Sequence, residues 1–157
     1  MKNVRFTALV LLALAFSLLT GCAARTFKPS NSFQAEGCPP AGIEVVANHL
    51  SDELAGLYPP GHTTLYLHQS ADPKDTLGPA FDQALRSRGF IMAAELRGQA
   101  LTLAYVLDRI DQETWYTKLT ISNGLTLTRT YQTKGDSFVI EGGARTNIME
   151  PVDGQKR

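Results

Sequence analysis

Apolar residues recur at helical spacing in residues 43–58 of this 157-residue chain. The i, i+3, i+4, i+7 rhythm predicts an amphipathic helix with one buried face. The residues expected on that face are Ile43, Val46, Ala47, Leu50, Leu54, Leu57 and Tyr58. Two consecutive prolines and a glycine at 59–61 must end the helix.

A second helix is predicted over residues 77–88, because apolar residues again fall on one face. Asp75 or Thr76 is expected to cap its start, and Gly89 suits its C-terminal cap. The cations in its last turn complement the helix dipole, and we prefer this interpretation to an anion-binding site. These cations are Arg86 and Arg88. The residues expected on the buried face of the helix are Leu77, Phe81, Ala84 and Leu85.

Between the helices, residues 63–68 alternate apolar and polar side chains as a strand does. From Phe90 onward the chain is typical of β structure, with the successive strands FIMAAE, LTLAYVL, TWYTKLTIS, LTLTRTYQ and SFVIE. The order is α-β-α-β followed by a β-meander. The sequence therefore predicts an α+β fold with two helices packed on a mostly antiparallel sheet.

The turn Ser122-Asn123-Gly124 sets the register of one predicted hairpin. A two-residue loop would place Lys118 opposite Arg129, which pairs like charges. A three-residue loop with Gly124 left-handed sets Ile121 against Leu125, Leu119 against Leu127 and Trp115 against Tyr131. A slip of one residue would turn every side chain to the wrong face, so the three-residue loop is predicted.

The N-terminus has the organisation of a targeting segment. Lys2 and Arg5 precede an uncharged apolar run over residues 7–19 that is too short for a transmembrane helix, which needs roughly 20 apolar residues. The run ends in Leu-Thr-Gly-Cys at residues 19–22, which resembles the lipobox of bacterial lipoprotein precursors. That resemblance implies cleavage after residue 21 and lipid attachment at Cys22; the alternative is a plain signal peptide in which Cys22 is incidental.

A lipid-anchored organisation follows from this interpretation. Residues 1–21 are the predicted signal peptide, and residues 22–42 form a lipidated cysteine and a flexible Ser/Pro/Gly-rich tether. One globular domain is expected over 43–145 and a flexible tail over 146–157. Resemblance to sorted lipoproteins, with Ala-Ala after the cysteine, implies the outer membrane, with the body facing the periplasm.

Charge excludes one class of function. Without Lys2 and Arg5, 13 basic residues face 15 acidic ones, and no basic block is present. Nucleic-acid-binding proteins present a cationic face. We therefore expect no direct contact with nucleic acid.

The sequence carries no zinc-binding spacing, nucleophile elbow or phosphate-binding loop. The histidines at 49, 62 and 68 are spread over a helix, a turn and a strand, and are expected on the surface. Cys38 lies in a Pro/Gly-rich segment and is interpreted as an incidental accessible thiol, because a flexible cysteine makes a poor catalytic partner for His49 or His62.

The carboxylates of Asp108 and Asp111 are interpreted as turn formers. No catalytic, cofactor-binding or metal-binding residue, no cofactor and no small-molecule substrate is predicted, so we do not expect an enzyme.

Aromatic residues on the outer face of the predicted sheet leave two interpretations open. Tyr66 and Tyr116 lie opposite the leucine rows and would be exposed in a monomer. Exposed aromatics often anchor protein partners, but they are also ordinary on the outer face of a strand.

Four segments together resemble one family. They are LYPPGHTTLYLHQ, LGPAFDQALRSRGF, LTLAYVLDRID and GLTLTRTYQ, within residues 43–134, with a lipobox upstream. Their order and spacing are similar to those of the TrbH family of conjugal transfer lipoproteins. The resemblance implies a non-catalytic component of the mating-pair-formation apparatus, a type IV secretion system, whose partners are the membrane and other secretion proteins. The alternative is a general outer-membrane lipoprotein that supports envelope integrity.

Overall fold

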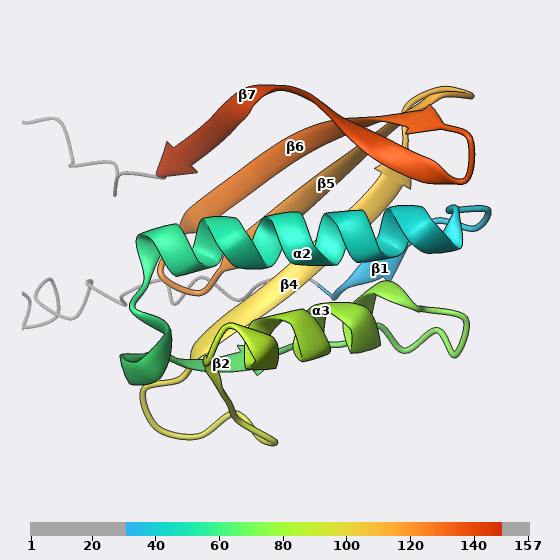
Figure 1. Cartoon of the computed structure of the whole chain (residues 1–157). Coiled ribbons are helices and arrows are strands. Elements are labelled where there is room, and N and C mark those ends of the chain that lie inside the picture. Colours follow the sequence, from blue (N-terminus) through green and yellow to red (C-terminus); the bar gives the residue numbers. More distant parts are fainter. Residues whose placement is uncertain (1–30, 149–157) are drawn as a thin grey trace, which may run out of the picture.

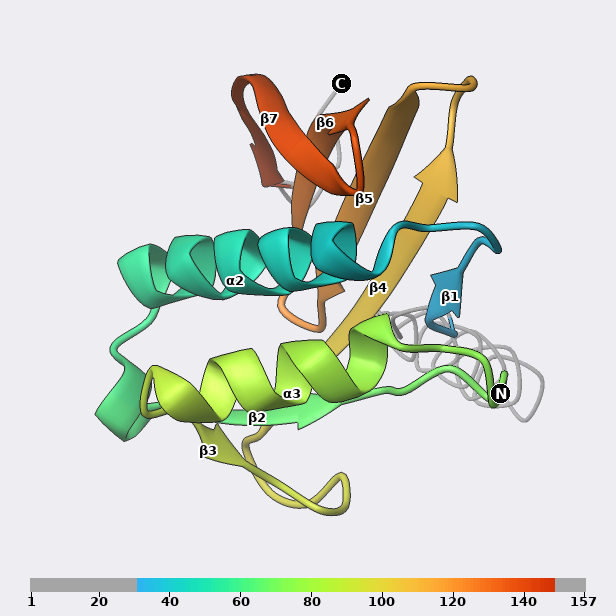
Figure 2. The same cartoon turned by 45° about the vertical axis from the view of Figure 1, so that its right-hand side comes forward.

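The computed structural model describes residues 31–148, with side chains through residue 141. Two helices lie side by side on one face of a curled sheet (Figure 1), and the second view places both on the same side (Figure 2). The predicted α+β class is confirmed. The elements are β1 Phe33–Gln34, α2 Pro40–Leu57, η1 Pro60–His62, β2 Thr64–Leu67, α3 Leu77–Ser87, β3 Ile91–Met92, β4 Leu101–Arg109, β5 Thr114–Ile121, β6 Leu125–Lys134 and β7 Ser137–Ile148.

The sheet has the strand order β3-β2-β4-β5-β6-β7, and β1 pairs separately with β4. The meander from β4 to β7 is antiparallel throughout, as predicted. The short strands β1 and β2 instead run parallel to β4. The helices cover one face, where the core forms, and no helix within residues 31–148 lies on the other face (Figure 2).

Strand β1 was not predicted, and it lies inside the tether expected over residues 22–42, so that expectation is wrong for residues 33–34. Both β1 and β2 use the same edge of β4, where Leu67 pairs with Leu103 and Phe33 with Val106. Between them the Tyr105 N–H donates to Ser32 Oγ (3.1 Å), and the Ser32 hydroxyl donates to the His68 carbonyl. A segment without periodicity is thus ordered because it satisfies backbone groups of β4.

Helix α2 begins at Pro40, three residues before the predicted start. Proline is favoured in the first turn because its missing N–H would have no partner there. Five of the seven predicted face residues are buried: Ile43, Val46, Ala47, Leu50 and Leu54. Leu57 was predicted wrongly and is 48% exposed, since it is the last helical residue and Tyr58 packs against the core instead.

Helix α3 buries all four predicted residues, and its ends explain its length. At the C-terminus, Gly89 has φ +87°, and the N–H groups of Gly89 and Phe90 donate to the carbonyls of Arg86 and Leu85. This Schellman arrangement confirms Gly89 as the cap. At the N-terminus the Asp75 carboxylate accepts from the amides of residues 77 and 78, whereas the Thr76 side chain makes no capping bond.

The predicted β5–β6 hairpin is confirmed. Gly124 has φ +93°, and its N–H donates to the Ile121 carbonyl at 2.9 Å. Leu119 pairs with Leu127 and Trp115 with Tyr131, and all four side chains are buried. The period-two pattern therefore selected the right loop length.

A bulge in β7 bends the edge of the sheet. Thr128 pairs with Arg145 and Thr130 with Glu141, so three residues of β7 oppose Arg129 alone. β7 arches over α2 in Figure 1, and the Phe138 ring lies 5.7 Å from both the Trp115 and Tyr131 rings. The strand continues to Ile148, so the backbone of residues 146–148 belongs to the sheet and not to the predicted tail.

Candidate functional site

The predicted lipid-attachment residue, Cys22, lies outside the described residues, so its role stays a prediction. Within residues 31–148, no helix is both long and apolar enough to cross a membrane.

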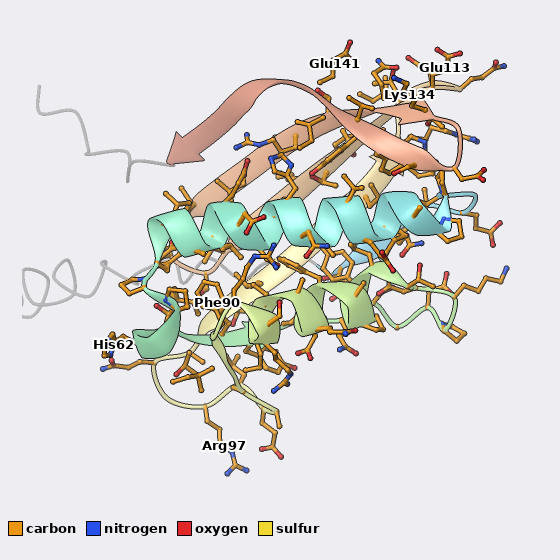
Figure 3. The ribbon with its side chains drawn as sticks, in the orientation of Figure 1. His62, Phe90, Arg97, Glu113, Lys134 and Glu141 are labelled. Carbon is orange, nitrogen blue, oxygen red and sulfur yellow. The ribbon has the colours of Figure 1, made fainter. Side chains whose placement is uncertain are left out.

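The three histidines occupy separate places. His62 lies in η1 at one corner of the molecule (Figure 3), His68 follows β2, and His49 lies on α2. Among the described residues, no group of three His, Cys, Asp or Glu side chains is placed to hold a metal ion. The expectation of surface histidines is wrong for His49, whose side chain is only 20% exposed.

Cys38 is less accessible than its sequence context indicates. Its side chain is half-buried and packs against the core, and its thiol lies 3.9 Å from the Pro39 carbonyl. Burial raises the pKa of Cys38 to about 12, because a thiolate loses hydration there. The thiol is therefore protonated at neutral pH and is a poor nucleophile.

Alkylation of Cys38 is expected to be slow while the chain is folded. In a full-length Cys22→Ser variant, where Cys38 is the remaining cysteine, iodoacetamide at pH 8 should react ~10²-fold to ~10³-fold more slowly than in denaturant, because the thiolate fraction is smaller. The folded rate should still rise between pH 8 and 10, since the raised pKa lies above that range. Equal rates in the folded and denatured chain would contradict the burial of this thiol.

The two aspartates interpreted as turn formers behave differently. Asp111 accepts hydrogen bonds from the amides of Glu113 (2.9 Å) and Thr114 (2.8 Å), and these bonds lower the pKa of Asp111. Asp111 is a turn former, as predicted. Asp108 instead lies within β4, paired with Tyr116, so its interpretation was wrong.

The aromatic side chains divide between the two faces of the sheet. Tyr105, Trp115 and Tyr131 are buried on the helix-covered face. Tyr66 and Tyr116 alternate with buried neighbours and are half-buried on the helix-free face. Their partial burial reduces the apolar area that they offer to a partner.

A polar cluster between α2 and the sheet was not predicted. Arg129 of β6 is 5% exposed, and its Nε and Nη2 both donate to Glu53 Oε1 on α2. His49 of α2 contacts both this pair and the neighbouring tyrosine of β6, with Nε2 3.2 Å from Glu53 Oε1 and Nδ1 3.1 Å from the Tyr131 hydroxyl. Burial also raises the pKa of Tyr131 above its usual range. The cluster joins α2 to β6. Because the Arg129 guanidinium is buried and already paired with Glu53, it is unsuited to binding an anion from solvent.

A second set of polar contacts fixes the start of α3. The Tyr105 hydroxyl donates to Asp75 Oδ2, and burial together with this carboxylate raises the pKa of Tyr105. Gln34 Oε1, from β1, accepts from the amides of Thr76 (3.0 Å) and Leu77 (2.8 Å). The same side chains that satisfy the helix end therefore connect α3 to β1 and β4.

Arg88 has specific partners beyond the helix dipole. Its Nε donates to Asp52 Oδ1 (2.6 Å) and its Nη2 to the Asn48 carbonyl (3.0 Å), so it ties the end of α3 to α2. The bond from Arg88 lowers the pKa of Asp52. Arg86 pairs instead with Asp82 on its own helix.

An open groove of about 540 Å³ lies between α2 and the first half of β7. One wall is the solvent side of α2, and the other is the edge of β7, where Ile140 is 44% exposed. The lining residues are Ala41, Glu44, Val45, Asn48, His49, Asp52, Ser137 and Ile140. This arrangement of a helix beside a strand edge suits contact with another chain better than chemistry.

The chain matches a known protein family. The model of the family described as conjugal transfer protein TrbH matches residues 26–145. That range includes nearly all of the described body, from β1 into β7. No curated protein and no solved structure matches the chain.

Proposed function

Because the chain belongs to the TrbH family of conjugal transfer proteins, we propose that it is a lipid-anchored, non-catalytic component of a conjugative type IV secretion apparatus. The family match over most of the body is the observation that carries this proposal. In this role the protein is held at the outer membrane through Cys22, with its body in the periplasm, and is bound there by other transfer proteins.

The described body supports a role in binding. Its conspicuous charged cluster, around Arg129, is taken up by contacts between α2 and β6. Its one described thiol is protonated at neutral pH because its pKa is raised. The acidic balance of the chain after residue 21 argues against direct handling of DNA.

Deletion of the gene from a conjugative donor is expected to reduce plasmid transfer sharply, and expression of the intact chain should restore it. The assay is transfer frequency in matings with a matched recipient. Normal transfer from the deletion strain, combined with envelope defects, would instead favour the general outer-membrane lipoprotein.

A Cys22→Ser chain should take up no labelled palmitate, leave the outer-membrane fraction and restore transfer poorly at equal expression. Several buried acyl chains hold a protein at a membrane at roughly 0.8 kcal/mol per methylene, and this variant would lack them. The matched control is Cys38→Ser, which should keep both label and location. Label on the Cys22→Ser chain would contradict the proposed attachment site.

A further inference from the structure

The outer edge of β7 has unused hydrogen-bonding groups. β7 ends the sheet among the described strands and pairs there with β6 alone. Two residues separate the paired Lys134 and Ser137, so this pair is a hydrogen-bonded one. From there, non-hydrogen-bonded and hydrogen-bonded pairs alternate, and Phe138 and Ile140 fall in non-hydrogen-bonded pairs with β6. The N–H and C=O groups of Phe138 and Ile140 consequently point away from β6. Such an edge is a template for another strand.

The groove between α2 and β7 lies along this edge. Val45 is half-buried and Ile140 is 44% exposed, and both line the groove, so an apolar surface accompanies the free backbone groups. Figure 1 shows α2 running beneath the arch of β7. A strand added to β7 would therefore rest one row of its alternating side chains against α2.

The charge of the groove is acidic. Glu44 and Asp52 line it, whereas no lysine or arginine of the described residues does. Asp52 is neutralised by Arg88, and Glu44 makes no ion pair within the described part of the chain. The groove thus offers an uncompensated carboxylate beside its apolar centre.

We propose that this groove binds an extended segment of another transfer protein, which pairs with β7 through its backbone. The segment places an apolar side chain against Ile140 and Val45 and a basic side chain near Glu44. A second copy of this chain is disfavoured as the occupant, because two copies paired through β7 would bring two acidic grooves together. The inference rests on the proposed function in its choice of partner.

A photo-cross-linking residue at Ala41, which is exposed and lines the groove, tests the proposal in donor cells that carry the whole apparatus. Ultraviolet light should join the full-length chain to a transfer protein, and mass spectrometry should map the cross-link to an extended apolar and basic segment. The same residue at Leu96, which is 60% exposed in a distant loop, should not capture that segment.

Two neighbouring substitutions supply the matched control. Ile140→Glu should reduce the Ala41 cross-link by at least ~10-fold, because a carboxylate would be buried beside an acidic surface. Val139→Glu should leave it unchanged, since Val139 is similarly exposed (48%) but points to the other face of β7. Glu44→Lys changes a helix surface residue without touching β7, and it too should weaken the cross-link. Melting temperatures establish that each variant is folded.

Several results would overturn the proposal. They are a cross-link to a second copy, a cross-link to residues 149–157 of the same chain, equal capture from Leu96, or a yield insensitive to both Ile140→Glu and Glu44→Lys. If deletion abolishes transfer but Ile140→Glu and Glu44→Lys transfer normally, the groove proposal fails while the proposed function stands. If the deletion strain transfers normally, the proposed function itself fails.

Discussion

Replacement of Glu53 by Ala is expected to lower the free energy of unfolding by about 3 kcal/mol, because it leaves a buried guanidinium without its carboxylate. Arg129 is 5% exposed, and two of its nitrogens donate to the same Glu53 oxygen. The substitution also removes the partner of His49 Nε2, which lies 3.2 Å from that oxygen. Urea unfolding of the purified full-length Cys22→Ser chain and of the same chain with Glu53→Ala measures the difference.

Two variants separate this effect from loss of a surface charge. Asp52→Ala removes the adjacent carboxylate, whose side chain is 68% exposed and pairs with Arg88. It should change stability by less than about 1 kcal/mol. The double change Glu53→Leu with Arg129→Met should recover much of the lost stability, since no unpaired charge remains in the core. Similar losses for Glu53→Ala and Asp52→Ala would contradict the special burial of the first pair.

Gly78→Ala is expected to lower the free energy of unfolding by about 2 kcal/mol, although alanine favours helices. A Cβ at this position in α3 would lie 2.5 Å from the Tyr105 hydroxyl oxygen and 2.8 Å from Asp75 Oδ2. It would therefore force apart the partly buried hydrogen bond between Tyr105 and Asp75 at the start of the helix. The measurement is again the unfolding midpoint in urea.

Gly56→Ala provides the control for Gly78→Ala. Gly56 also lies in a helix, α2, but a Cβ there would meet nothing within 4 Å. This change should raise stability by about 0.5–1 kcal/mol through the lower entropy of the unfolded chain. If both changes stabilised the protein, the close approach at Gly78 would not constrain α3.

Periodic patterns predicted the helices and the meander. On α3 the buried residues are spaced at helical intervals, as Leu77, Phe81 and Leu85 are, and on β5 and β6 more and less buried residues alternate. Such periods indicate the face of an element that is buried in the core, so they could be read from the sequence.

Strand β1 could not be predicted in this way, because two residues are too few to show a periodic pattern. Its place depends on the part of the β4 edge that β2 leaves unpaired. Because β2 ends at Leu67, opposite Leu103, β1 can pair with β4 further along, at Val106 and Leu107.

The polar cluster around Arg129 was missed, although the sequence carries a signal for it. In the predicted register Arg129 falls on the same face as Leu127 and Tyr131, where a cation needs a partner. The partners Glu53 and His49 lie one turn apart on α2. Which helix lies over Arg129 is decided by tertiary packing, and a single sequence does not specify it.

The attachment of β1 also determines how the body responds to a pulling force. A force that pulls on the chain ahead of Ser32 would first load two hydrogen bonds between β4 and the residues that flank β1. They run from the Tyr105 N–H to the Ser32 hydroxyl and from the Ala35 N–H to the Leu107 carbonyl. Their rupture would free residues 31–39, a segment that spans at most roughly 30 Å when fully extended, before α2 carried the load. Because Gln34 also caps α3, tension on the N-terminal side would loosen that helix end while the meander stayed intact.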